Sequence, residues 1–150
     1  MRWSRFVVVC TCLALIVAGI STMSAQKKMK EPVVWPADNI KWMDVKEAPG
    51  VMYADLWGHM DKGAYGAFVK FPAGTKHPLH SHTNDIKAIV ISGTFWVTPE
   101  GGKEQRLPAG SYFFVPGGSK HMSGSTDDGP CEIFQESPGK FDMMPAEEKK

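Results

Sequence analysis

The chain has 150 residues, 43% of them hydrophobic, and its 17 lysines and arginines nearly balance 16 acidic residues, for a net charge of +1. This balance excludes a protein that binds nucleic acid through a basic face, and it provides no polybasic signal for a membrane surface. The length suits one domain with a core of its own.

The first 25 residues have the order of regions typical of a secretory signal peptide. Two arginines precede an apolar run over residues 6–20, and small residues follow up to Ala25, after which we expect cleavage. An uncleaved membrane anchor is the alternative, although a span needs about 20 apolar residues. We therefore predict a signal peptide over 1–25 and a periplasmic or secreted domain over 26–150, without stable membrane association after cleavage.

Cleavage would leave one cysteine of three, Cys131, so that no disulfide could form within the mature chain. The two arginines would also be lost, which leaves 15 basic against 16 acidic residues and a charge of about −1. We expect Cys131 to be a buried small hydrophobic residue rather than a nucleophile. Stability must then come from packing, from a metal ion or from subunit contacts.

After a lysine-rich lead-in over 26–33, the chain consists of short apolar or alternating runs separated by Gly, Pro and Asp. Such runs predict β-strands, and no segment has a sustained helical period. The expected strands are 40–45, 51–57, 64–71, 76–82, 86–98, 111–115 and 131–136. The tail from residue 144 is expected to be frayed and solvated. Many short strands in one domain indicate a sandwich or a barrel.

Two turns have the same form. Residues 71–74 and 107–110 both have Pro second and Gly fourth, which suits a type I turn, and a histidine follows each after a similar interval. They are either two ordinary turns or the starts of two equivalent hairpins of a jelly roll that face one cavity.

Three histidines form a candidate metal site. His80 and His82 are two residues apart, so on a strand they share a face about 6.5–7 Å apart, and His121 must come from another strand. Three neutral imidazoles leave positions open for water, oxygen or substrate. We predict one divalent ion on these ligands, with Zn, Fe, Mn, Ni and Cu all compatible. The alternative is a metal-free barrel with hydrogen-bonded core histidines. His77 is expected beside the ligands or at the surface, and His59 in an exposed turn.

The spacing of these histidines resembles the two motifs of the cupin superfamily. The first is Gly, five residues, His-x-His, three or four residues, Glu, six residues, Gly; the second is Gly, five residues, Pro-x-Gly, two residues, His, three residues, Asn. The residues that match are Gly74, His80, His82, Gly93, Gly110, Pro116, Gly118 and His121. The resemblance implies an all-β, double-stranded β-helix (a jelly-roll barrel) over 26–150. It is nearest to small bacterial cupins similar to the zinc-binding cupin domains of anti-sigma factors.

Two positions depart from the motifs. Ile86 stands where the family has a glutamate ligand, and Ser125 stands where it has asparagine. Asp85 could ligate only after a one-residue change of register, which reverses the face, and Gln135 is the other side chain that could face the cavity. Some cupin dioxygenases use three histidines without a carboxylate, so the resemblance still implies metal binding. A more positive site would favour an anionic ligand such as an enolate or a carboxylate.

Two functions remain open. One is an exported metal-dependent dioxygenase or isomerase that acts on a small organic acid; the sequence names no general base for it, and Asp85 and Gln135 are the side chains to test. The other is a non-catalytic module that binds or senses a metal or a small molecule. Both take a small-molecule ligand, and the sequence leaves open whether the protein is an enzyme. The resemblance also implies a homodimer, with Trp35, Ile40 and Trp42 as candidate contacts.

Overall fold

The computed structural model describes residues 31–147, so the predicted signal peptide lies outside the described residues. Contacts divide the chain into Met1–Val33 and Val34–Lys150, and the fold below belongs to the second unit. Its only helical turn among the described residues is η1 (Ala37–Asn39). Over residues 31–147, no helix has the length and apolar character required to span a bilayer.

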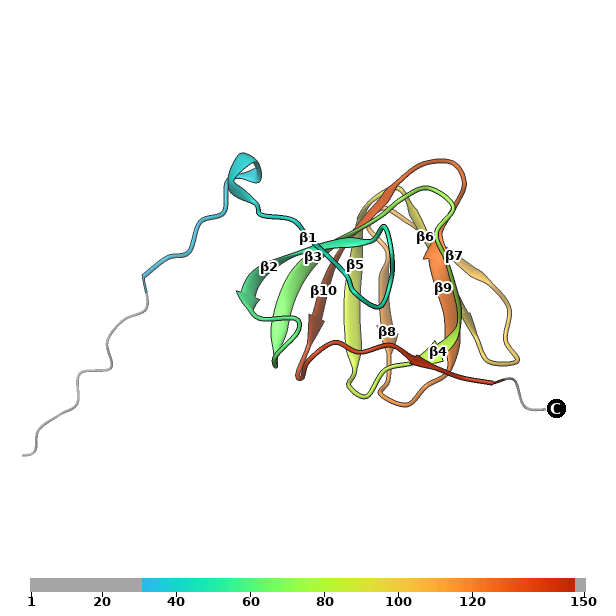
Figure 1. The fold of residues 1–150 in the computed structure, drawn as a ribbon. Helices are drawn as coiled ribbons and strands as arrows, with labels where there is room; N and C mark the ends of the chain where they lie inside the picture. The colour runs from blue at the N-terminus through green and yellow to red at the C-terminus, as the bar shows by residue number, and fades with distance from the viewer. Residues whose placement is uncertain (1–30, 148–150) are drawn as a thin grey trace, which may run out of the picture. The chain divides into compact units, whose positions relative to one another are not determined.

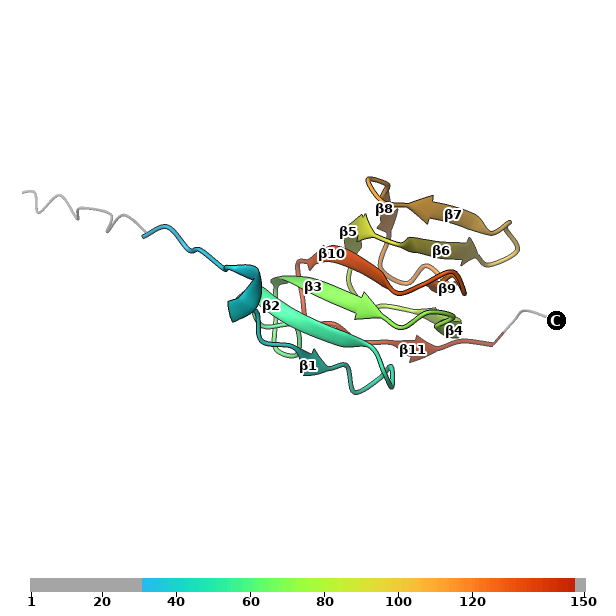
Figure 2. The ribbon, with the colours of Figure 1, turned by 90° about the horizontal axis from the view of Figure 1, so that it is seen from above.

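Two antiparallel sheets make up the domain (Figures 1 and 2). Sheet A has the strand order β1-β2-β3-β10-β5-β8, and sheet B has the order β11-β4-β9-β6-β7. The strands are β1 (Met43–Asp44), β2 (Met52–Gly58), β3 (Tyr65–Phe71), β4 (Lys76–Ser81), β5 (Ile86–Ser92), β6 (Thr94–Pro99), β7 (Gln105–Pro108), β8 (Tyr112–Val115), β9 (His121–Ser125), β10 (Cys131–Ser137) and β11 (Met144–Pro145). The prediction of an all-β, jelly-roll-like fold is confirmed.

The core lies against the inner face of sheet A. Every second residue of β10 is buried, from Cys131 to Ser137, as expected for a strand with one face inward. Ile133 is 1% exposed and pairs with Val69 on β3 and Val90 on β5, both also buried. Each such side chain stabilises the fold by about 1.5–3 kcal/mol. Burial raises the pKa of Cys131 to about 11, which leaves the thiol protonated and unreactive, as expected.

The single strand expected over 86–98 is two strands, β5 in sheet A and β6 in sheet B. Gly93 separates them with φ of +70°, and a Cβ there would lie 2.3 Å from the carbonyl oxygen of Pro130. Glycine is therefore required where the chain crosses between the sheets. The apolar pattern concealed the break, because both strands contribute buried residues.

Three strands were not expected, and the strand expected at 40–45 is reduced to Met43–Asp44. β9 consists mostly of small and polar residues, which rarely indicate a strand, and its position is determined by pairing with β4 and β6. β7 pairs with β6 at the edge of sheet B. The tail from residue 144 is exposed at Met144 and Pro145, as expected, but these two residues are not frayed, because β11 pairs with Ser81 and His80 on β4.

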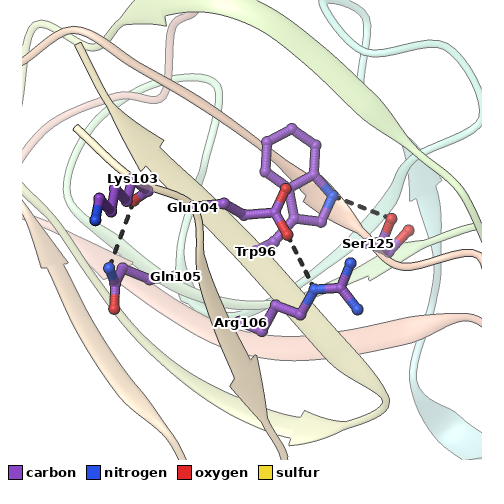
Figure 3. A network of polar contacts seen from close by, with 6 residues as sticks. All are labelled: Trp96, Lys103, Glu104, Gln105, Arg106 and Ser125. Carbon is purple, nitrogen blue, oxygen red and sulfur yellow. Dashed lines mark hydrogen bonds and ion pairs between the residues drawn. The ribbon is translucent and has the colours of Figure 1, made fainter. Parts of the chain in front are cut away.

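The outer face of sheet B has a polar network of its own (Figure 3). The indole Nε1 of Trp96 donates to the carbonyl of Ser125 at 3.2 Å, and Arg106 pairs with Glu104 at 2.9 Å beside it. The Ser125 side chain, which replaces the motif asparagine, donates to the carbonyl of Pro72 and accepts from the amide of Thr75. Ser125 thus has a structural role, since it secures the turn that leads into β4.

Candidate metal centre

Neighbouring strands of sheet B bring the three histidines together. His80 on β4 lies opposite His121 on β9, and His82 follows β4 directly. The register shifts between His77 and His80, a bulge that contains Pro78, which cannot donate to the ladder. The side chains are only 3%, 7% and 4% exposed for His80, His82 and His121.

One potential ligand atom from each ring lies within 4.8 Å of the others. The ring centroids are 4.3 Å apart for His80 and His121, 5.0 Å for His80 and His82, and 5.2 Å for His82 and His121. The convergence predicted from the motifs is confirmed, and these three histidines could hold one metal ion. That they do so remains a prediction.

Backbone carbonyls determine which nitrogen of each ring is available. The Nδ1 atom of His80 lies 2.7 Å from the carbonyl oxygen of Pro78, and that of His121 lies 3.1 Å from that of Ser119. The Nδ1 atom of His82 lies 2.5 Å from the carbonyl oxygen of Asp142. Since a carbonyl only accepts, each Nδ1 donates and each Nε2 has the free lone pair. Ligating histidines in proteins are oriented in this way.

The rings are neutral near pH 7, as metal ligation requires. Burial lowers the pKa of His80 to about 4, against the opposing bond to Pro78, and the neighbouring His121 and His82 lower it further. Burial is also the main cause of the lowered pKa of His82 and of His121. Neutral, buried and oriented imidazoles suit a divalent cation.

The histidines face a mostly apolar cavity between the sheets. Its wall includes Val69, Phe71, Phe95 and Phe113, with Phe95 and Phe113 stacked at 5.0 Å. The cavity leaves about 40 Å³ for the centres of water-sized molecules. Because one water needs roughly 10–15 Å³ of such space, the cavity fits a ligand of few non-hydrogen atoms.

Ile86 and Gln135 face this cavity, whereas Asp85 does not. Ile86 is 4% exposed, so an apolar side chain occupies the place of the family's glutamate. Asp85 instead accepts from the amide of Gly117 at 2.8 Å. Gln135 is 5% exposed, and its Nε2 donates to the hydroxyl of Tyr65, whose pKa is raised by burial. No carboxylate, lysine or arginine from residues 31–147 lines the cavity.

The sequence left the position of His77 open and did not indicate that the C-terminal segment contributes to the site. His77 lines the cavity, with its ring 6.0 Å from that of His80, and burial lowers its pKa. Phe141 and Met143 from the C-terminal segment also line it, and the Phe141 ring lies 5.2 Å from that of His82. The apolar residues among the polar ones of this segment were the available signal that it is partly buried.

Asp142 lies between these two residues and holds the backbone beside the site. Its carboxylate accepts from the amide of Thr83 at 2.8 Å and from the Thr83 hydroxyl at 2.5 Å. Partial burial acts to raise the pKa of Asp142, but the two bonds from Thr83 and the proximity of His82 outweigh it and lower the pKa. The Asp142 side chain is thus ionised at every pH at which the histidines are neutral.

Comparison with known proteins identifies the family. Residues 24–144 match the family described as a domain of unknown function, DUF4437. Among solved structures, KdgF from Halomonas sp. is 28% identical, with a TM-score of 0.56 over 69% of this chain and 92% of that one. The polyketide cyclase RemF from Streptomyces resistomycificus is 15% identical, with a TM-score of 0.65 over 81% and 89%.

An RmlC-like cupin from Shewanella frigidimarina is 23% identical, with a TM-score of 0.56 over 73% of this chain and 92% of that one. A search of the curated proteins finds no match. The chain therefore has the cupin fold, and it belongs to the DUF4437 family.

Proposed function

We propose that the protein binds one divalent metal ion through the Nε2 atoms of His80, His82 and His121 and acts there on a small organic acid, as a dioxygenase or an isomerase. The observation that carries the proposal is the convergence of three buried imidazoles within 4.8 Å, each with Nδ1 bonded to a carbonyl. When bound, such an ion supplies a Lewis acid that polarises a substrate oxygen.

The residues around the ligands have separate roles in this proposal. The apolar wall, which includes Ile86, excludes water from the site. The substrate oxygen would then bind on the side of the ion that the three histidines leave open. Gln135, held by Tyr65, offers an amide group to the substrate. His77 is the titratable side chain of the described cavity that lies outside the ligand set, so it is our candidate for moving a proton. Asp85 is not, because it faces Gly117.

The fold neighbours support a small-molecule substrate. RemF is a polyketide cyclase, and it shares the two-sheet architecture with this chain. The small volume of the cavity also favours a compact ligand. The neutral ligand set would leave the charge of a bound cation uncompensated, which favours an anionic oxygen donor such as a carboxylate or an enolate.

Metal analysis tests the proposal directly. Protein purified without chelators, at or above neutral pH so that the imidazoles stay unprotonated, should contain about one ion per chain. His80→Ala and His121→Ala should contain almost none. His59→Ala is the matched control, because the His59 side chain is 64% exposed and lies outside the site. Metal content that is equal in all variants would refute the site, and turnover of a screened acid that survives metal removal would refute its role in catalysis.

A non-catalytic binding or sensing module is the second candidate. It is favoured by Ile86 at the position of the family's glutamate and by the absence of any carboxylate from the described cavity wall. Under this alternative the protein would be similar in role to the zinc-binding cupin domains of anti-sigma factors. A ligand that binds in air, with metal present, and is recovered unchanged after hours would support it.

Export and dimerisation complete the proposal. The order of regions in the first 25 residues supports export, which cell fractionation and the mass of the mature protein would test. Trp35 is 51% exposed, and Ile89 and Tyr112 are exposed on sheet A, so apolar surface is available for a second copy. Trp42 is less available, because Lys70 covers its ring at 3.7 Å. A monomer in sedimentation at micromolar concentration would refute the dimer.

A further inference from the structure

The segment after β10 lines the cavity through Phe141 and Met143 before it joins sheet B. We call residues 138–146 the strap; Figure 1 shows it running from the end of β10 to β4. The amide of Phe141 donates to the carbonyl of Met60 at 2.8 Å, and the amide of Ala146 donates to that of Leu79 at 2.9 Å. Backbone bonds therefore hold the strap on both sides of Asp142, and Phe141 and Met143 line the same cavity as the histidines.

Asp142, in the middle of the strap, makes three bonds to two adjacent residues. Its carbonyl oxygen accepts from Nδ1 of His82, and its carboxylate accepts from both the amide and the hydroxyl of Thr83. The carboxylate thus fixes the position of Asp142 relative to the chain that carries His82. Because the carboxylate and the carbonyl belong to the same residue, the bonds from Thr83 to the carboxylate also fix the position of the carbonyl beside His82.

The other two histidines are oriented without the strap. The acceptor for His80 is Pro78, and the acceptor for His121 is Ser119, each two residues earlier in the same stretch of chain. The acceptor for His82 lies 60 residues away. The orientation of His82 is therefore the one that depends on a contact between distant segments.

The remaining neighbours of His82 cannot replace this contact. The Phe141 side chain packs against the ring, and it is apolar. Asp61 shares an outer surface hollow with Asp142 but is exposed and makes no hydrogen bond to His82 or Thr83. Within the described residues, Asp142 alone both accepts from His82 and holds the adjacent Thr83.

We infer that Asp142 is a positioning residue for the metal site: its carboxylate holds Thr83 so that its carbonyl keeps the His82 ring in the Nδ1–H form, with Nε2 toward His80 and His121. The metal-affinity consequence rests on the function proposed above. The orientation of His82 does not, because it is a property of the metal-free protein. Loss of a group that orients a ligand typically costs about 10–100-fold in metal affinity.

The test compares Asp142→Ala with Asp61→Ala, which removes an equal charge from the same hollow without touching Thr83. In metal-free protein with ¹⁵N-labelled histidine, near pH 7.5, NMR should show His82 in the Nδ1–H form in the wild type and in Asp61→Ala. In Asp142→Ala it should show a mixture of the two tautomers. Co²⁺ affinity should fall about 10–100-fold in Asp142→Ala, with an altered visible spectrum, and stay within about twofold in Asp61→Ala.

Two milder variants keep the test decisive if Asp142→Ala folds poorly. Thr83→Val removes the hydroxyl bond, and Asp142→Asn keeps an acceptor for the Thr83 amide; both should shift the tautomer of His82 less than Asp142→Ala. An unchanged tautomer and unchanged Co²⁺ affinity in all three variants would overturn the inference. If the wild type binds no Co²⁺ at the histidines, the proposed function fails, while the tautomer measurement still decides the role of Asp142.

Discussion

The hairpin strands and the strap orient the same site in different ways. On β4 and β9 the acceptors for His80 and His121 are two residues away, so these rings are oriented wherever the strands form. The acceptor for His82 is Asp142, 60 residues later in the chain, so this hydrogen bond exists only when the strap is packed against the rest of the domain. Two of the three candidate ligands are therefore oriented locally within sheet B, whereas the orientation of His82 depends on tertiary structure.

His82 should lose its orientation more readily than His80 and His121. Contacts between distant segments are lost in partial openings that leave the central strands intact, and the strap is paired with sheet B over only two residues, in β11. We expect strap opening to release His82 while His80 and His121 stay in place.

Metal removal should affect the strap more than the strands. If the ion is present at 100 times its Kd, a chelator should lower the free energy of unfolding by about 2.7 kcal/mol. Hydrogen exchange should then rise most at the amides of Phe141 and Ala146 and least at the amide of Ser125, which bonds across sheet B. His80→Ala is the control and should not respond to the chelator. An equal rise in exchange at all of these amides would contradict the expected difference between the strap and the strands of sheet B.

Acid should destabilise the metal-free protein through the buried histidines. The pKa of His80 falls from 6.5 to about 4 on folding, so the unfolded chain binds more protons between these pH values. The contribution is therefore fully present above pH 6.5 and is lost as the pH falls toward 4. After allowance for solvent screening we expect about 1–3 kcal/mol from this group.

Denaturation in urea at pH 7.5 and pH 5 would measure the effect. His80→Gln should have a flatter pH dependence than the wild type, and His59→Gln, at a position outside the cavity, is the control. An equally steep fall in His80→Gln would show that the acid sensitivity comes from another group.

Removing the apolar contact of the strap should have a moderate effect. Phe141→Ala deletes a half-buried ring beside His82, and we expect a loss of about 1–3 kcal/mol, below the cost of a fully buried phenylalanine. Phe114→Ala is the control, since Phe114 is 47% exposed on sheet A, and should change stability by less than about 0.5 kcal/mol. Equal losses in thermal unfolding would mean that the strap contributes no packing.

The smallest effect is expected at Asp85. Asp85→Asn keeps an acceptor for the Gly117 amide and removes a charge that does not line the cavity. Metal affinity should stay within about twofold of the wild type, because the Asp85 carboxylate contacts the Gly117 amide and lies outside the cavity wall. A tenfold or larger loss of metal affinity would show that the Asp85 side chain reaches the metal instead of the Gly117 amide.

Much of the fold could be predicted from the sequence. Alternation of apolar and polar residues located most of β2, β3, β5, β8 and β10, because one face of sheet A packs against the core. β9 was missed because a strand of small and polar residues carries no such pattern. The break at Gly93 was missed because apolar residues occur both before and after it, in β5 and in β6.

The three histidines of the site were predictable for a local reason. Their spacing within two Gly- and Pro-bounded motifs determines which strand faces they share, and strand pairing then brings His80 opposite His121. The exclusion of Asp85 from the cavity follows equally from the alternation of faces beside the buried Ile86.

The class of fold, the identity of the converging histidines and the lack of an acidic residue at the place of the family's glutamate could all be predicted from local patterns in the chain. The structure was needed to find that Gln135 and His77 share the cavity, and that Asp142 and Phe141, near the C-terminus, contact His82. The reason is physical: strand periodicity is a local property of the chain, whereas the position of a strap depends on which distant groups it meets.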